Sequence, residues 1–446
     1  MNSTLLPAGV NLHALHRLAP ARYSFLLQST AAASSLGGFD LLLMSQGDSL
    51  VLDRPGQLSG VAAAGQQEFL TALDAWWRDE RVALCGSNLP FAGGWFLYLG
   101  YELAAEIEPS VGLFNDPILP TAFAVRCPAA LIVAHNTGQC HFVAEPGSDF
   151  DAETVLTDML AARELVEAIA TQQEIRIDEE DPDRFLGAVA AAKNHIAQGE
   201  VYQANLSRGW SATMPCVDAN RIYAALCKSN PGPFAGLAYW DGVSIISSSP
   251  ERLVHIRDGY ISTRPIAGTR PRSDDPAYDK RLLNELLGDP KERAEHVMLI
   301  DLERNDLGRI CEPGSVKVSE KMVIESYAHV HHIVSNIHGC LRPSVTPGEV
   351  IRAVFPGGTI TGCPKVRCMQ IISELEAGPR GAYTGSFGYL NRDGSMDLNI
   401  LIRTMVVRDG KVSWRAGSGI VADSDPEAEL NETRAKAKGL LRAILP

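Results

Sequence analysis

Two pairs of glutamates stand out because each pair has the spacing of one helix face. Glu292 and Glu295 follow an Asp-Pro helix start, and Glu429 and Glu432 follow another. Residues three apart on a helix point the same way, and magnesium is usually held by one or two carboxylates together with water and substrate oxygens. Two facing helices could therefore supply a magnesium site. Taken singly, each pair is more typical of a solvated helix face near the N-terminus, so the pattern is informative only in company.

The segment VYQANLSRGW adds a row of polar side chains. In a strand Gln203, Asn205 and Ser207 point to one side, whereas Tyr202, Ala204 and Leu206 point to the other. The polar row predicts the lining of a wet cavity, and an ordinary half-exposed strand is the alternative.

Further segments could receive an anion. FPGGTITGCPKVR is a glycine-rich turn that runs into a helix beginning at Pro364, and AGSGIVAD at 416–423 is a second glycine turn after a strand. Their backbone N–H groups could cradle a carboxylate, although either segment could be only a tight loop. Arg403 lies in the apolar run LNILIRTM, where its guanidinium requires a carboxylate partner from the protein or a ligand.

The histidines of HVHHIV, which are His329, His331 and His332, are weak candidates for a metal site. No cysteine or carboxylate stands at a matching ligand spacing, and most such histidines are structural.

The elements that must position these groups are strands grouped apart from helices. Asp-Gly pairs between apolar runs, a strong hairpin signal, occur at 241–242, 258–259, 393–394 and 409–410. Helices are expected after Asp181-Pro182, Asp289-Pro290, Thr346-Pro347, Cys363-Pro364 and Asp425-Pro426. This grouping predicts an α+β fold and not a doubly wound βαβ sheet.

Composition excludes several classes of function. The chain has 446 residues, 46% of them hydrophobic, and a net charge of −13, which opposes binding to nucleic acid or to an anionic membrane. No secretion signal or membrane span is apparent, and the nine cysteines include no CxxC pair. We therefore expect a cytoplasmic protein with reduced thiols.

A polar stretch at 171–183 reads as a solvated connector. It divides the chain into an N-terminal region, 1–170, in which a helix is expected over about 153–170, and a C-terminal region, 181–446, that carries all the candidate groups above.

The C-terminal region resembles the chorismate-utilising enzymes, a family that includes anthranilate synthase component I, aminodeoxychorismate synthase component I, isochorismate synthase and salicylate synthase. The segments that carry the resemblance are RPIAGTRPR, EHVMLIDLERNDLGRIC, FPGGTITGCPKVR, GAYTGSFGY, MDLNILIRT and AGSGIVADSDPEAELNET. The resemblance implies a large antiparallel β-sandwich with helices packed outside, and chorismate as the substrate.

The resemblance also implies a magnesium ion on the ring carboxylate of the substrate. By motif position Glu295 and Glu432 are its direct ligands, with Glu292 and Glu429 behind them. His332 and Thr359 correspond to positions next to the ring of the substrate. The positions around the enolpyruvyl group and its carboxylate correspond to Tyr383, Arg403, Gly417, Gly419 and Lys436.

Two positions bear on the reaction. Gln203 stands where isochorismate and salicylate synthases carry a lysine that activates water, which points to ammonia as the nucleophile. Ala267 stands in PIAGT, where many aminodeoxychorismate synthases carry a lysine and anthranilate synthases an alanine. Because YQANLSR, GGWFLYLGYEL and SSSPERLV look more like aminodeoxychorismate synthase, we predict 4-amino-4-deoxychorismate, for 4-aminobenzoate and folate synthesis. Anthranilate for tryptophan synthesis is the alternative, and a catalytically silent module of the same fold is the second.

No glutaminase motif of the Cys, His, Glu type is recognisable, so the resemblance implies a separate glutamine amidotransferase subunit as the source of ammonia. The N-terminal region resembles one in which relatives hold tryptophan, with Ser29 and Pro231 as the candidate pocket residues.

Overall fold

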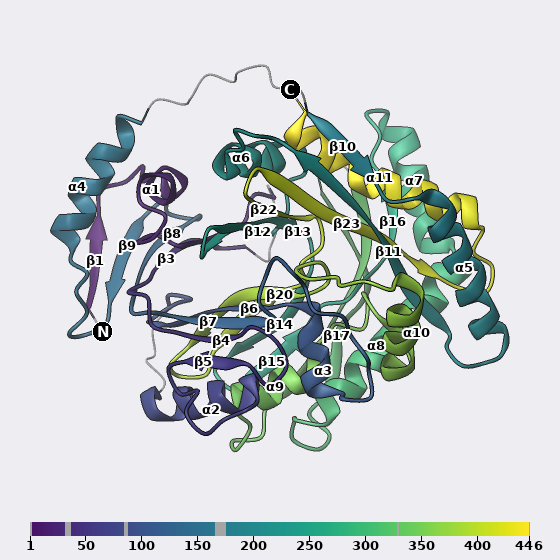
Figure 1. Cartoon of the computed structure of the whole chain (residues 1–446), viewed down its shortest axis with the longest axis horizontal. Coiled ribbons are helices and arrows are strands. Elements are labelled where there is room, and N and C mark those ends of the chain that lie inside the picture. The colour runs from purple at the N-terminus through teal and green to yellow at the C-terminus, as the bar shows by residue number, and fades with distance from the viewer. Residues whose placement is uncertain (1, 32–36, 84–87, 166–174, 328–329, 446) are drawn as a thin grey trace.

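The structure is a computed structural model that describes residues 2–31, 37–83, 88–165, 175–327 and 330–445. Among these residues the chain forms two large antiparallel sheets of 12 and 11 strands, called sheet A and sheet B. The sheets face each other, and the helices lie on their outer sides (Figure 1).

Sheet A combines strands from both ends of the chain. Its strands, in spatial order, are β1 (Asn2–Leu6), β9 (Cys140–Ala144), β8 (Ala129–Ala134), β3 (Phe39–Met44), β2 (Phe25–Gln28), β12 (Phe234–Trp240), β13 (Val243–Ser249), β22 (Thr404–Arg408), β23 (Lys411–Ile420), β11 (Gln203–Thr213) and β10 (Arg176–Glu179), and β19 (Gly362–Cys363) pairs with β11.

Sheet B has the same mixed origin. Its strands, in spatial order, are β16 (Ile266–Pro271), β18 (Val330–Cys340), β15 (Tyr260–Thr263), β14 (Arg252–Arg257), β21 (Met396–Asn399), β20 (Ser386–Asn391), β6 (Gly94–Leu99), β7 (Ala122–Cys127), β4 (Ser49–Leu52) and β5 (Leu58–Gly60), and β17 (Lys317–Ser326) pairs with β18. The regions 1–170 and 181–446 are thus joined through both sheets.

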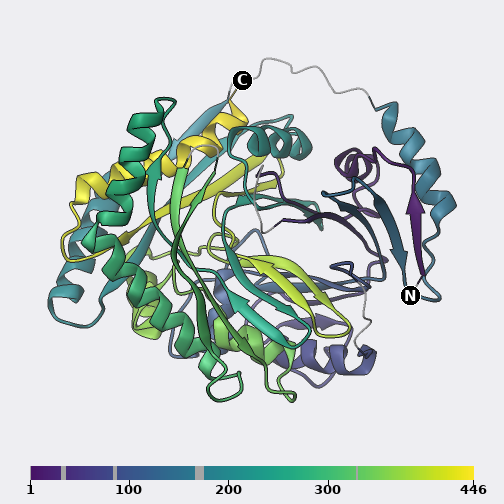
Figure 2. The same ribbon diagram turned by 180° about the vertical axis from the view of Figure 1, so that it is seen from behind.

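The helices form the outer layers. Those that contact sheet A are α1 (Leu12–Leu18), α4 (Ala152–Arg163), α5 (Pro182–Ala197), α6 (Ala219–Ser229), α10 (Lys365–Glu376) and α11 (Pro426–Ile444). Those on the side of sheet B are α2 (Phe69–Glu80), α7 (Pro276–Gly288), α8 (Pro290–Gly308) and α9 (Pro347–Val354), and the short η1 (Tyr101–Leu103) and α3 (Ala104–Ile107) follow β6. The view from behind shows the same layers (Figure 2). Within the described residues, no helix is both long and apolar enough to cross a membrane.

Apolar packing explains this layering. One buried cluster lies between the two sheets and contains Phe25, Phe96, Phe123 and Phe387, with the rings of Phe25 and Phe96 stacked 3.8 Å apart. Other clusters join each sheet to its outer helices. Each sheet therefore buries apolar side chains on both faces, and the predicted α+β sandwich with external helices is confirmed.

The Asp-Gly hairpins are confirmed as well. All four pairs connect adjacent antiparallel strands. Asp241, Asp258 and Asp409 have positive φ angles of 45°, 52° and 48°, and each is followed by a glycine with positive φ. Two successive positive φ angles are what a type I′ turn requires.

Four local predictions need correction. The connector predicted at 171–183 contains β10, which adds an edge strand to sheet A. The glycine turn predicted at 416–423 is mostly strand, because β23 continues to Ile420. Helix α10 begins at Lys365, one residue after the predicted start. The helix predicted over about 153–170 is α4, which ends at Arg163, while 166–174 lie outside the described residues.

Candidate active site

The floor of the candidate site is the paired ladder of β11 and β23. Even-numbered side chains of β11 such as Leu206 and Trp210 pack against the outer helices, so the odd-numbered ones face the opposite side. The predicted polar row of Gln203, Asn205 and Ser207 therefore faces inward, with Asn205 opposite Gly419 and Ser207 opposite Gly417.

Two glycines of β23 permit close packing across this floor. A Cβ at Gly419 would lie 2.4 Å from Nε2 of Gln203, and a Cβ at Gly417 would lie 2.7 Å from the hydroxyl of Tyr383. A Cβ at Gly417 would also lie 2.5 Å from the backbone carbonyl of Leu206, so this glycine is required by contact and not by a turn, whereas a Cβ at Gly419 would meet only the movable end of Gln203. Gln203 and Tyr383 thereby lie directly over the strand.

His332 on β18 forms another part of the wall. Its Nδ1 lies 2.9 Å from Oγ1 of Thr269, and its Nε2 is buried without a hydrogen-bond partner. Burial first, and the nearby Arg403 guanidinium second, lower the pKa of His332 to about 3. The imidazole is therefore neutral at physiological pH, with one nitrogen available to a ligand.

Arg403 lies in the same cleft and has a left-handed backbone, with φ of 53°. Its carbonyl accepts a hydrogen bond from the N–H of Ser248. Across the described residues its guanidinium makes no hydrogen bond or ion pair. Burial lowers the pKa of Arg403, and the charge of Glu251 only partly offsets this. The carboxylate partner that the sequence demanded is thus not a bonded protein group, which favours an anionic ligand.

Glu251 was not singled out from the sequence, although it lies in the segment SSSPERLV. Its side chain is 4% exposed, and burial raises the pKa of Glu251 to about 7. Thr359, a predicted site residue, lies beside the Glu251 carboxyl group. The N–H of Ile266 donates a hydrogen bond to Oε1 of Glu251 over 3.4 Å. A carboxyl group that is partly protonated near neutral pH suits general acid catalysis. The only sequence signal was an acidic residue directly after the proline that follows β13.

Several buried polar atoms in this cleft have no hydrogen-bond partner, which is costly unless a ligand or water satisfies them. They are Gln203 Oε1, Asn205 Oδ1, His332 Nε2 and Thr359 Oγ1. Because they come from β11, β18 and the turn before α10, the cleft between these elements is the best candidate for a polar ligand.

The glutamate pairs flank this cleft from α8 and α11. Glu292 pairs with Arg270 at 2.9 Å and lies against Gly268, where a Cβ would be 2.9 Å from its Oε2. Glu432 pairs with Lys436 at 2.7 Å, and Nζ of Lys436 donates to the carbonyl of Gly417 over 2.9 Å. One pair is therefore next to β16 and the other next to β23.

A protein-only metal site is not formed. In the part of the chain that the structure describes, no group of three or more His, Cys, Asp or Glu side chains is placed to hold an ion. Magnesium needs fewer protein ligands, since water and substrate oxygens complete its shell. Glu295 and Glu429 are half-buried beside their partners Glu292 and Glu432, so the donor set suits this ion by its chemistry.

Ala267 lies on β16 opposite Ile333, next to a bulge that ends at Thr269. Its half-buried methyl group carries neither a nucleophile nor a charge, and its cross-strand neighbour is Ile333, whereas His332 is paired with Thr269. The position where some relatives carry lysine is thus chemically inert here.

The remaining predicted residues lie elsewhere. Ser29 lines a small cavity of about 100 Å³ between β2 and β20, and Pro231 is a neighbour of this region through the hydrogen bonds between Thr30 and Gly232. Neither residue lies in the cleft of His332. His329 lies outside the described residues.

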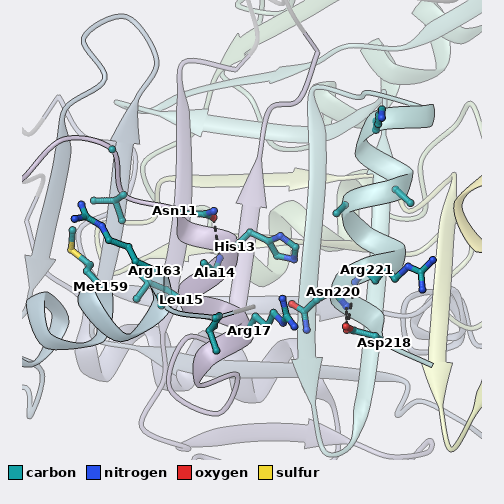
Figure 3. Close-up of a pocket in the computed structure, with 17 residues that line it drawn as sticks. Asn11, His13, Ala14, Leu15, Arg17, Met159, Arg163, Asp218, Asn220 and Arg221 are labelled. Carbon is teal, nitrogen blue, oxygen red and sulfur yellow. Dashed lines mark hydrogen bonds between the residues drawn. The ribbon is translucent and has the colours of Figure 1, made fainter. Parts of the chain in front are cut away.

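A cavity of about 880 Å³ lies between α1, α4 and α6 (Figure 3). It is lined by Asn11, His13, Arg163 and Arg221 among others, and by none of the predicted site residues. The cleft that contains His332 and Arg403 is therefore distinct from this cavity.

Comparison with known proteins identifies the family to which the chain is similar. Residues 39–442 match a family described as chorismate binding enzyme. An anthranilate synthase component I-like protein from Synechocystis is 42% identical over 364 residues, covering 80% of this chain and 74% of the relative. Anthranilate synthase component 1 from Aquifex aeolicus is 37% identical over 448 residues, covering 95% and 89%.

Solved structures show the same fold. Anthranilate synthase component I from Streptococcus pneumoniae superposes with a TM-score of 0.79 at 30% identity, covering 92% of this chain and 93% of that one. The menaquinone-specific isochorismate synthase from Escherichia coli gives a TM-score of 0.73 at 19% identity, covering 100% and 94%, which is a likeness of fold alone.

Proposed function

The chain belongs to the chorismate-binding enzymes, and we propose that it converts chorismate and ammonia to anthranilate, as component I of an anthranilate synthase. Ala267, which lies on β16 two residues before Thr269, the partner of His332, carries this choice, because an alanine cannot form a covalent adduct with the ring. The relatives named anthranilate synthase component 1 support it. They do not support 4-amino-4-deoxychorismate, the product preferred from the sequence.

Charge complementarity supports the orientation of the substrate. Chorismate carries two carboxylates, and the enolpyruvyl carboxylate is assigned to Arg403, which has no bonded partner among the described residues. Tyr383, Gly417 and Gly419 then lie along the enolpyruvyl side. A charge-assisted pair in this setting would stabilise the complex strongly.

Glu251 is the proposed general acid. In its protonated form it can give a proton to the 4-hydroxyl group, which leaves as water while ammonia adds at ring carbon 2 and the double bonds shift. The added nitrogen releases one proton. Loss of the proton at carbon 2 together with the enolpyruvyl group then gives anthranilate and pyruvate. The neutral His332, whose Nε2 lacks a partner, is placed to hydrogen-bond the ring substituents.

Magnesium belongs to the proposal as well. Glu295 and Glu432 are its proposed ligands, with Glu292 and Glu429 behind them, and a bound ion would neutralise the ring carboxylate. Without the ion, Arg270 balances the charge of Glu292 and Lys436 balances that of Glu432. Ammonia is proposed to come from a separate glutamine amidotransferase subunit.

Product analysis tests the function. The purified chain is incubated with chorismate, magnesium and ammonium at mildly alkaline pH, and products are separated by chromatography with and without added aminodeoxychorismate lyase. Anthranilate that forms without the lyase is the expected result. If 4-aminobenzoate forms only with the lyase, the product is 4-amino-4-deoxychorismate, as predicted from the sequence. If chorismate is not consumed, the chain is a catalytically silent module of the same fold.

Ala267→Lys sharpens the test. If the inert side chain decides where ammonia attacks, the lysine variant loses anthranilate formation, whereas Ala267→Ser retains it. Equal anthranilate yields from both variants would contradict this role for Ala267.

A further inference from the structure

Glu303 of α8 is a second buried carboxyl group near the proposed general acid Glu251, and the mechanism above does not use it. Its side chain is 6% exposed. Among the described residues its carboxylate forms no ion pair, since Lys365, whose charge acts on it, pairs with Asp306 at 2.6 Å. A buried carboxyl group without a paired cation is costly in its charged form, so Glu303 readily holds a proton.

The glycine-rich turn before α10 contacts both carboxyl groups. A Cβ at Gly358 would lie 3.4 Å from Oε1 of Glu303 and 2.5 Å from Cδ2 of Leu302, so this glycine lets the turn lie against α8. The next residue, Thr359, lies beside Glu251. Consecutive residues of one turn thus contact the two glutamates, and the negative charge of Glu303 acts on Glu251.

The segment that leads from β15 to β16 contacts both groups as well. Thr263, at the end of β15, lies beside Glu303. The N–H of Ile266, at the start of β16, donates to Glu251 over 3.4 Å. Two segments that are far apart in the sequence therefore hold the same two glutamates as neighbours.

Two buried hydroxyl groups lie along this pair of glutamates without a hydrogen-bond partner. They are Oγ1 of Thr359, beside Glu251, and Oγ1 of Thr263, beside Glu303. A hydroxyl group can accept one proton while it gives up its own, and an unsatisfied buried hydroxyl suits a bridging water. The space between the glutamates is thus lined by groups that can pass a proton.

Beyond Glu303 this row of groups reaches solvent. Asp306, three residues later on α8, and its partner Lys365 both line an outer cavity of about 530 Å³ between α3, α8, α9 and α10. The exposed side chains of Asp301 and Arg309 line it too, and none of the predicted site residues does. Burial first, and the charge of Asp306 second, raise the pKa of Glu303, and Lys365 offsets this in part.

The proposed reaction leaves Glu251 one proton short. Its proton departs in the water formed from the 4-hydroxyl group, while the proton released by the added nitrogen goes to solvent. Glu251 therefore ends a turnover as a carboxylate, and one proton must come back before the next.

We propose that Glu303 returns this proton to Glu251 by way of the Thr263 and Thr359 hydroxyl groups, and then takes a proton from water in the outer cavity beside Lys365. Glu303 gives up one proton and gains one, so the relay leaves no net change. Glu303 acts through Glu251 and is assigned no contact with the substrate. This inference rests on the proposed function, because it presumes Glu251 as the general acid. The competing interpretation is that Glu251 recovers its proton directly from the added nitrogen.

Comparing first and later turnovers tests the relay, because the first turnover uses the proton already on Glu251. The first is measured with the magnesium-loaded chain in excess over chorismate, and the later ones with chorismate in excess, both at saturating ammonium. Glu303→Gln keeps the shape of the side chain but removes the proton carrier. The matched control is Asp301→Asn, on the same helix and lining the same outer cavity, but 64% exposed.

Glu303→Gln should slow later turnovers about tenfold or more, while the first turnover changes less than about twofold. Removing the charge of Glu303 also lowers the pKa of Glu251, since that charge raises it. Both rates are therefore compared on the acid side of the pH profile, where Glu251 begins protonated in every variant. The control should match the unsubstituted chain in both rates.

Added formate supplies a readout that a purely structural role would not change. In Glu303→Ala the missing side chain leaves room for this small acid, which should restore later turnovers, whereas Glu303→Gln should not respond. Equal slowing of first and later turnovers, no slowing, or later turnovers that formate does not restore would overturn the relay. If Glu303→Gln fails to fold, Thr263→Val must show the same separation of the two rates, and its absence counts against the relay.

Failure of the relay differs from failure of the function. If the unsubstituted chain forms no anthranilate even in its first turnover, the proposed function falls. If it does, and the Glu303 variants turn over repeatedly at the rate of the unsubstituted chain, only the relay is wrong.

Discussion

Arg380 is buried and Arg403 is half-buried in the same interior, yet their surroundings are opposite. Arg380 donates to Glu376, to the carbonyls of Asn205 and Ile360, and to Thr384. Burial alone would lower its pKa, but the charge of Glu376 raises it above the ordinary value. Arg403 makes no such bond among the described residues, and burial lowers its pKa.

The difference indicates that Arg380 has a structural role and Arg403 a functional one. An arginine with every donor satisfied fixes the segments it touches, and here these carry Gln203, Thr359 and Tyr383 at the site. An arginine without a partner carries an unbalanced cost that a bound anion would relieve. The first should matter for stability and the second for turnover, and the following predictions are ordered by the expected change in the free energy of unfolding.

Arg380→Met should cause the largest loss of stability. Removing Arg380 leaves the buried Glu376 with Arg415 as its remaining ion-pair partner, and loss of one partner of a buried ion pair costs up to about 3–5 kcal/mol. Urea unfolding measures the change, and Arg281→Met is the control, because Arg281 pairs with Glu285 on the surface. Adding Glu376→Gln should restore part of the loss. A change below about 1 kcal/mol would remove the structural role of Arg380.

Glu251→Gln should alter how stability depends on pH. Because the folded pKa of Glu251 is raised to about 7, its contribution is fully present below its unfolded pKa and is lost as pH rises through about 7. The variant should gain on the order of 2 kcal/mol over the unsubstituted chain between about pH 5 and pH 8. Thermal unfolding across that range measures it. A difference independent of pH would contradict a protonated Glu251.

Arg403→Asn should leave the free energy of unfolding unchanged or raise it by up to about 1 kcal/mol, because an unbalanced charge disappears. Asparagine also tolerates the left-handed backbone. The value of kcat/KM for chorismate should fall about 100-fold or more. Arg408→Asn, on the exposed end of β22, is the control. Retained turnover would show that Arg403 does not bind the substrate.

Glu432→Ala should have the smallest effect on stability. Its pair with Lys436 is half exposed, and such pairs contribute less than about 0.5 kcal/mol. Magnesium-dependent turnover should nevertheless be lost. Glu427→Ala, in the first turn of the same helix and exposed, should keep it. Full activity in the Glu432 variant would remove the proposed metal ligand.

The sequence predicted the elements whose signals are local. An Asp-Gly pair needs only its own turn to be recognised, and an Asp-Pro pair defines a helix start within four residues. All four hairpins and the helix starts at Pro182, Pro290, Pro347 and Pro426 are therefore confirmed.

Features that depend on distant contacts could not be predicted in this way. Gly417 and Gly419 resemble turn residues, but Tyr383 and Gln203 pack directly against them in a continuous strand. The raised pKa of Glu251 arises from burial that only the assembled fold creates. Among the predicted site residues, the structure brings Gln203, His332, Arg403 and Lys436 around one cleft, whereas Ser29 lies between β2 and β20.

The mixed origin of both sheets has a consequence for biosynthesis. β6 pairs with β20, and β2 pairs with β12, so strands made early wait for partners made much later. Until those partners leave the ribosome, the early strands expose apolar faces and open edges, which favours slow folding and aggregation. We expect the isolated N-terminal region to be insoluble and the nascent chain to depend on chaperones.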